Sequence, residues 1–277
     1  MESLVREKNQ PVGENMNDED DIDYLSEEMD DAFSDEDESR NKANISDADP
    51  IASPNTVSAK PGPLKTKGSI CLHTRAAHKL FYGRKKDTEA KVAQIIGLLR
   101  FASNVNNLYD LASKDDPYAD MKLLEIETKF NQTTEFINSS IESLKDLLDG
   151  LEGVNIGNPE SVKPVHLPIE FKTTYGFLAA RILAKYDELV RLAQSAKHVG
   201  VIFSDDWGKL VGGAGRKIRD AFWTSNTYRF MGVNRDDLAA NNKVALRAIE
   251  KYGELPESIK DGSQRGRYAP EIIKLRK

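Results

Sequence analysis

One short stretch of the chain concentrates side chains that could bind a polyanion. Residues 65–86, KTKGSICLHTRAAHKLFYGRKK, hold seven Lys and Arg and no Asp or Glu, although the chain has a formal net charge of −6. Cationic side chains bind phosphates, and hydrogen-bond donors on a strand can reach base edges in the major groove of DNA. These residue types therefore predict contact with nucleic acid.

The first half of this stretch has the period of two that is typical of a half-buried strand. Apolar or uncharged side chains occupy one face: Ile70, Leu72 and Thr74. Polar side chains occupy the other face: Ser69, Cys71, His73 and Arg75. A reading face needs donors and small polar groups, so we predict base contacts by four residues: Lys67, Ser69, His73 and Arg75.

A short helix is expected to follow the strand. Thr74 can cap its N-terminus, and Gly83 can end it after Tyr82. Cations in and after this helix would meet DNA phosphates, which gives affinity and salt dependence but no sequence information. The predicted phosphate contacts are Lys79, Arg84, Lys85 and Lys86.

The distribution of charge divides the chain. Residues 1–66 contain 18 acids and 6 bases, whereas residues 67–277 contain 27 acids and 33 bases. We expect a disordered acidic tail and linker over 1–66, a helical DNA-binding and dimerisation domain with a β-ribbon over 67–260, and a basic C-terminal tail over 261–277. The acidic whole-chain charge therefore comes from the tail.

The acidic run at residues 14–39 has 14 acids and no base, and its few apolar residues cannot form a core. It is open whether this run only increases solubility, contacts RNA polymerase, or shields a basic surface. Apolar residues within the run favour contact with a partner: Ile22, Tyr24, Leu25, Met29 and Phe33.

Helical patterns dominate the rest of the sequence, which predicts a mainly α-helical fold with a short β-ribbon. Helices are expected from Asp87 or Thr88 to about 114, and over about 118–150, 174–197, 204–223 and 235–252. The clearest has apolar residues every seven positions: Phe130, Ile137, Leu144 and Leu151. Such a seam packs against another helix, within the fold or across a dimer. Four glycines at 208, 212, 213 and 215 would break the helix over 204–223 unless another backbone packs closely there.

The sequence gives little support for nucleotide binding, a metal site or catalysis. GGAGRK lacks the Ser or Thr that follows Gly-Lys in a phosphate loop, and Ile218 stands where a dinucleotide motif needs glycine. The single cysteine, Cys71, excludes an intramolecular disulfide and a CxxC zinc site, and the four histidines are scattered. Cys71 with His73 lacks a further base, so we expect no enzyme, metal or cofactor.

No apolar run approaches the roughly 20 residues of a membrane helix, and the N-terminus MESLVREKNQ lacks the apolar stretch of a signal peptide. We therefore expect an intracellular protein that does not contact membranes.

Four stretches resemble the AcaB-type proteins of conjugative plasmids and integrating conjugative elements. They are GSICLHTRAAHKLFYGRK, IIGLLRFASNVNNLYDLASKDDPYAD, YDELVRLAQSAKHVG and GRKIRDAFWTSNTYRFMGVNRDDLAANN. The resemblance covers roughly residues 67–260, and the four stretches follow one another in the same order as in the family. AcaB-like proteins are transcriptional regulators that activate conjugation functions, and their DNA-binding part resembles a ribbon-helix-helix. The resemblance implies a dimeric activator in the bacterial cytoplasm that binds double-stranded promoter DNA.

The strand that enters the groove has two candidates. A ribbon has two strands, and a two-fold axis could pair strand 67–75 with its copy in a second subunit. The alternative is VHLPIEF at 165–171, because two predicted helices follow it in ribbon-helix-helix order, although Pro168 and Glu170 would then face DNA. Charge favours the first strand, and the two strands could also pair within one subunit.

A different class of function is also open. The chain could be an accessory or structural protein of the conjugation machinery, with the seven-residue seam binding a protein partner. That hypothesis predicts a stable protein complex and no binding to DNA.

Overall fold

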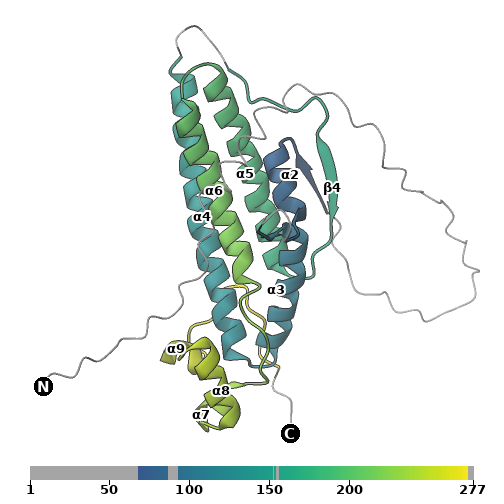
Figure 1. Cartoon of the computed structure of the whole chain (residues 1–277), viewed down its shortest axis with the longest axis vertical. Coiled ribbons are helices and arrows are strands. Elements are labelled where there is room, and N and C mark those ends of the chain that lie inside the picture. Colours follow the sequence, from purple (N-terminus) through teal and green to yellow (C-terminus); the bar gives the residue numbers. More distant parts are fainter. Residues whose placement is uncertain (1–67, 87–92, 152, 154–155, 274–277) are drawn as a thin grey trace, which may run out of the picture.

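A computed structural model describes residues 68–86, 93–151, 153 and 156–273, and helices form most of these described residues (Figure 1). The helices are α2 (Arg75–Tyr82), α3 (Leu98–Ser113), α4 (Pro117–Asp149), α5 (Thr174–His198), α6 (Ser204–Thr224), α7 (Arg235–Ala239), α8 (Lys243–Tyr252) and α9 (Glu257–Lys260). The strands are β1 (Gly68–Leu72), β2 (Gly83–Arg84), β3 (Ile95–Ile96) and β4 (Val165–Ile169). The mainly helical class with a short ribbon is confirmed. The acidic run and Lys67 lie outside the described residues.

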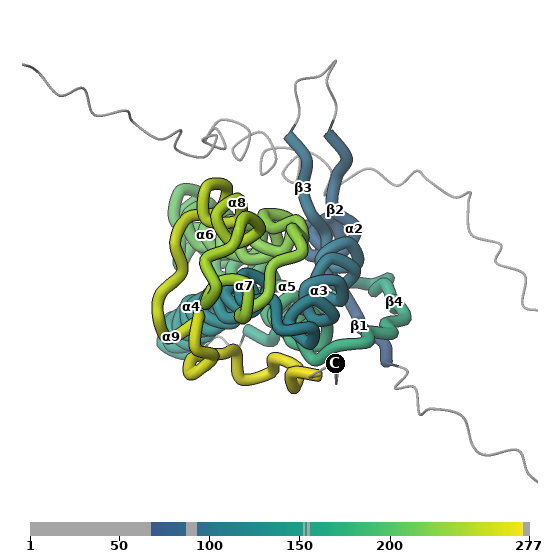
Figure 2. Tube along the Cα trace, turned by 90° about the horizontal axis from the view of Figure 1, so that it is seen from below, coloured from purple at the N-terminus to yellow at the C-terminus, as the bar shows by residue number. Residues whose placement is uncertain are grey.

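Four long helices, α3 to α6, lie alongside one another, and α7 to α9 gather at one end of this bundle (Figures 1 and 2). Three of the four predicted seam residues, Phe130, Ile137 and Leu144, are buried between α5 and α6 of the same chain, as are Ile141 and Leu148 of the same face; Leu151 lies beyond the end of α4 and is half-buried. Asp116 caps α4 by accepting from the N–H groups of Tyr118 and Ala119, and Pro117 occupies the first turn. The seven-residue pattern therefore builds the core of one subunit.

The expected start of α3 at residue 87 or 88 is wrong. Residues 93–97 are not helical; Ile95 and Ile96 form β3, which pairs with β2, and α3 begins at Leu98. Two glycines explain the hairpin: Gly83 has a φ of +73°, and a Cβ on Gly97 would overlap backbone atoms of Gly83 and Tyr82. This backbone contact places an extended pair where side-chain spacing predicted a helix.

Two further helix predictions have different outcomes. The glycine-rich helix α6 is unbroken although side chains, and not another backbone, lie against Gly213 and Gly215: a Cβ on Gly215 would make a tight contact of 3.2 Å with the Tyr186 hydroxyl, whereas one on Gly213 would lie at an ordinary 3.5 Å from Phe136. The single helix expected over 235–252 is wrong, because Asn241 has a φ of +47° and Asn242 caps α8. The result is two helices, α7 and α8.

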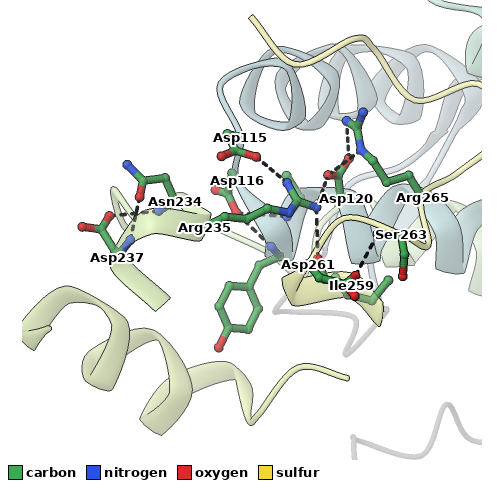
Figure 3. A network of polar contacts seen from close by, with 12 residues as sticks. Asp115, Asp116, Asp120, Asn234, Arg235, Asp237, Ile259, Asp261, Ser263 and Arg265 are labelled. Atoms are coloured by element: carbon green, nitrogen blue, oxygen red, sulfur yellow. Dashed lines mark hydrogen bonds and ion pairs between the residues drawn. The ribbon is translucent and has the colours of Figure 1, made fainter. Parts of the chain in front are cut away.

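A buried carboxylate joins three distant segments at the start of α4 (Figure 3). Asp120 is fully buried and accepts from Arg235 Nη2 at 2.7 Å and from Arg265 Nε and Nη2 at 2.8 Å each. Arg235 also pairs with Asp115 at 2.6 Å. Two guanidinium groups stabilise one buried carboxylate, so α7 and the C-terminal segment are fixed to α4.

The C-terminal segment, residues 261–273, continues along the bundle. Glu127 of α4 accepts from the backbone N–H groups of Arg267 at 2.8 Å and Tyr268 at 3.0 Å. The N–H of Ile273 donates to the carbonyl of Ser113 at 2.8 Å. The described part of this basic segment is therefore attached to the helices.

Next to this network, burial raises the pKa of the Asp116 carboxyl from 3.8 to about 6, because desolvation outweighs its hydrogen bonds from Tyr228, Ala119 and Tyr118. The Tyr228 hydroxyl donates to Asp116 at 2.6 Å. Folding therefore favours the protonated form of this carboxyl.

We predict that Gly97→Ala destabilises the protein by about 1–3 kcal/mol, because its methyl group would force the two backbones of the hairpin apart. Gly208→Ala is the matched control, since a Cβ on Gly208 meets no atom within 4 Å and its helix should gain about 0.5–1 kcal/mol. Urea unfolding measures both. A Gly97→Ala variant as stable as wild type would contradict the backbone contact.

We predict that protonation of Asp116 makes the free energy of unfolding depend on pH, and that Asp116→Asn abolishes this contribution. The folded protein binds the Asp116 proton more tightly than the unfolded chain, so the stability from protonation is full below about pH 4 and is lost as the pH rises through about 6. Between pH 7 and pH 5, wild type should gain about 1 kcal/mol relative to the variant. The exposed acid Asp146 on the same helix provides a control, and Asp146→Asn should follow wild type.

Candidate nucleic-acid interface

The two strands proposed for the ribbon pair with each other in one chain. β1 and β4 are antiparallel, with Ser69 opposite Pro168 and Cys71 opposite His166. The pairing within one subunit is therefore the one that the structure shows, in place of a pairing of strand 67–75 with its own copy.

The predicted alternation places the apolar side chains of the ribbon against the helices. Four are buried: Ile70, Leu72, Leu167 and Ile169. On the outer face, Ser69, His166 and Pro168 are exposed and Cys71 is half-buried. Val165, at the start of β4, is exposed although it shares the face of Leu167 and Ile169. The outer face of the ribbon thus presents two small polar side chains, a histidine and a proline, above a buried apolar face.

One of the predicted base contacts, His73, already has partners within the protein. Its Nδ1 accepts from the N–H of Ser161 at 3.2 Å, and its Nε2 lies 3.6 Å from Cys71 Sγ. An accepting Nδ1 places the proton of a neutral ring on Nε2, which then donates towards the thiol. His166 Nε2 lies 3.8 Å from the same sulfur. Within the described ranges, no group of three or more His, Cys, Asp or Glu residues could hold a metal ion.

A buried carboxylate that sequence reasoning missed holds the end of the ribbon. Asp187 of α5 accepts from the N–H groups of His73 at 3.1 Å and Thr74 at 2.8 Å, and from the Thr74 hydroxyl at 2.8 Å. Arg191 Nε lies 3.4 Å from the same carboxylate. The available signal was an acid at core spacing, four residues after Leu183 and three before Val190.

Because Asp187 ends the strand early, Arg75 does not lie on the strand face where it was predicted. The prediction placed Arg75 on the strand face, but β1 ends at Leu72 and Arg75 is the first residue of α2. The reason is local: Asp187 binds the N–H groups of the two intervening residues, and the Thr74 hydroxyl accepts from Ala77 as the expected N-cap. Arg75 therefore belongs to the exposed side of α2.

Cations lie on one side of the ribbon, on α2 and on the β2–β3 hairpin. Arg75 is exposed and Lys79 is half-buried, while Arg84, Lys85 and Lys86 are exposed. Arg84 Nε donates to the carbonyl of Ala93 at 3.2 Å, which ties that side chain to the hairpin. Figure 2 shows the hairpin projecting from one side of α2 and the ribbon lying on the other.

Residues 68–86 thus carry five Lys and Arg and no acid across the ribbon, α2 and the start of the hairpin. Positive charge on α2 beside the ribbon, and on the hairpin beyond α2, can attract a polyanion towards the ribbon. Of the predicted base contacts, the structure places Ser69 on the outer ribbon face, His73 just after it and Arg75 on α2; Lys67 lies outside the described residues.

Comparison with known proteins gives one family. The family described as "Transcriptional regulator AcaB" matches residues 60–273. The crystal structure of selenomethionine-containing AcaB from uropathogenic E. coli is 12% identical over 74% of this chain and 100% of that chain, with a TM-score of 0.48. None of the curated proteins matches the chain. Across the residues that the structure describes, no helix has both the length and the apolar character to cross a membrane.

We predict that Asp187→Ala destabilises the protein by about 2–4 kcal/mol, because it leaves the partly buried N–H groups of His73 and Thr74 without this acceptor. Glu188→Ala is the neighbouring control and should cost less than about 1 kcal/mol, since Glu188 makes only surface ion pairs with Lys145 and Lys185. Urea unfolding compares the two variants, and hydrogen exchange should show faster exchange at residues 73 and 74. Equal losses would contradict the anchoring role.

Proposed function

The chain belongs to the AcaB family of transcriptional regulators, and from this premise we propose that it binds promoter DNA and activates genes of conjugative transfer in the bacterial cytoplasm. Its targets would be upstream regions of the plasmid or integrating conjugative element that carries it. The proposal adds sequence-specific DNA contact and activation to the family assignment.

The observation that carries the proposal is the two-stranded ribbon whose first strand, β1, opens the acid-free stretch of residues 68–86; the second strand, β4, is followed by the exposed Glu170. A two-stranded antiparallel ribbon fits the major groove, where side chains of its outer face reach base edges. In this proposal the base contacts are Lys67, Ser69, His73 and Arg75, and the phosphate contacts are Lys79, Arg84, Lys85 and Lys86. His73 would read a base only if its contact with Cys71 opens.

The order β4, α5, α6 supports a core like that of a ribbon-helix-helix, with additional long helices around it. The second strand of each ribbon comes from β1 of the same chain. A homodimer would therefore present two ribbons, one from each subunit, to two half-sites. We propose this arrangement in place of one ribbon shared across the two-fold axis.

The acidic run at residues 14–39 is proposed to contact RNA polymerase. Its apolar residues within a dense negative charge favour a protein partner over a purely solubilising role. The alternative function, an accessory protein that recruits a partner through the α4 seam, loses its main support because α5 and α6 already bury that seam.

We predict that Lys85→Ala weakens binding to all duplexes alike and reduces the slope of log K against log salt concentration by about 1, because it removes one phosphate contact. Arg75→Ala should instead reduce the preference for the target over unrelated duplex, by about 1–3 kcal/mol. Lys209→Ala, an exposed lysine of α6 outside the cationic stretch, is the control and should bind as wild type does.

Gel shifts with fragments upstream of the conjugation genes, repeated at several salt concentrations, measure these effects. Failure of the full-length protein to prefer any such fragment would refute the proposal. Loss of binding in the Lys209→Ala variant equal to that in Lys85→Ala would show that the contact surface lies elsewhere.

A further inference from the structure

A groove of about 610 Å³ runs between α4 and α5, next to the C-terminal segment. Figure 2 shows this segment crossing the side of the bundle that α4 and α5 form. One end of the groove is set by Glu127, which binds the Tyr175 hydroxyl at 2.6 Å and the N–H groups of Arg267 and Tyr268. The α4 residues of the lining follow the three- and four-residue spacing of one helix face: Glu127, Phe130, Asn131, Thr134, Ile137 and Asn138.

The groove combines a small apolar floor with cations on its sides. The floor is formed by Leu178 of α5 and Tyr268 of the C-terminal segment, which are half-buried, whereas Phe130, Ile137 and Ile182 are buried beneath it. Three cations line it: Arg181, Lys185 and Arg267. Such a surface fits a partner that is both apolar and acidic.

The two carboxylates of the lining already have donors. Glu127 accepts from one hydroxyl and two backbone N–H groups. Glu188 accepts from Lys145 at 3.2 Å and from Lys185 at 2.8 Å. The Lys185–Glu188 ion pair compensates both of its charges, and Arg181 and Arg267 then outnumber the remaining carboxylate, Glu127, so the lining favours an anionic occupant.

The N-terminal part of the sequence contains a segment with matching chemistry. Within the acidic run of residues 14–39, Ile22, Leu25, Met29 and Phe33 follow one another at intervals of three, four and four residues. This spacing places side chains on one face of an amphipathic helix, and acids occupy most of the positions between them. Helices of this type bind grooves through anchors at such intervals.

The lengths agree. From residue 22 to residue 33 an α-helix rises roughly 17 Å, and the α4 side of the groove, from Glu127 to Asn138, spans the same number of residues and hence roughly 17 Å.

The tether between the segment and the folded part of the chain is also long enough. The 34 residues from 34 to 67 span roughly 30 Å as a random coil, and they lead to Gly68, which pairs with Ile169 shortly before α5 begins.

We propose that the acidic segment around residues 22–33 docks in the α4–α5 groove of its own chain. The apolar stripe would lie on the floor, and the acids would face the three cations of the lining. Docking would withhold this segment from other partners until a competing surface releases it. A short tether supports this site, because it raises the effective concentration of the segment to about the millimolar range.

Zero-length carbodiimide cross-linking of the full-length protein, without DNA, tests the docking. This reagent joins a carboxylate to a lysine amine that it touches. The expected product links an acid of residues 18–38 to Lys185, whose side chain is 50% exposed. Products with the exposed lysines Lys209 and Lys243, which lie on other helices, should be rare, and 1 M salt should suppress the Lys185 product.

Two matched substitutions in the segment distinguish the packing of its apolar stripe from the effect of an added negative charge. Met29→Asp should reduce the Lys185 product about tenfold, because it removes a buried apolar anchor. Tyr24→Asp adds the same charge to the opposite side of the helical stripe and should leave the yield unchanged. In the groove, Arg181→Glu should lower the yield, whereas Lys209→Glu should not.

Other outcomes would overturn the proposal. Cross-links spread over lysines in proportion to their exposure would mean that the segment has no fixed site. A mixture of nitrogen-15-labelled and unlabelled protein that gives mixed-label products would mean that the groove binds the segment of a second copy. Because no DNA is present, failure here leaves the proposed DNA recognition untouched, and the gel shifts test that separately.

Discussion

The carboxylate of Asp187 is the interaction on which the candidate interface depends. It lies inside the bundle on α5, and it binds the backbone of the two residues between β1 and α2. Those hydrogen bonds end the strand, allow Thr74 to start the helix and set the direction of the cationic stretch that follows. A buried acceptor for three donors gives a defined geometry, because leaving any of these groups unpaired in the interior is costly. The polar ribbon is thus attached to a rigid helix.

A second buried carboxylate performs a similar task at the other end of the bundle. Asp120 binds Arg235 and Arg265, and so fixes α7 and the C-terminal segment to α4. That segment then closes one end of the groove between α4 and α5. Lys185 and Ile182 lie two and five residues from Asp187, which places them roughly 140–160° around α5. One helix therefore supports the ribbon on one side and the proposed docking groove on another.

Local patterns in the sequence were sufficient for several features of the interface. The alternation of residues 68–72 predicted which side chains of β1 are buried, and Thr74 and Gly83 predicted both ends of α2. The heptad spacing predicted the buried stripe of α4. Long-range contacts produced the errors. Ile95 and Ile96 form a strand because Gly97 meets Gly83, and Arg75 leaves the strand face because Asp187 binds the preceding backbone.

The sequence by itself determined the mainly helical class, the faces of the ribbon and helices, and the concentration of cations in residues 68–86. These properties depend on neighbours within a few positions, which spacing and composition record directly. Only the tertiary structure decided that β1 pairs with β4, that Asp187 and Asp120 serve as buried acceptors, and that α4 and α5 leave a groove between them. Each of these features joins residues far apart in the chain, and it exists because burial requires partners for polar groups that local sequence does not identify.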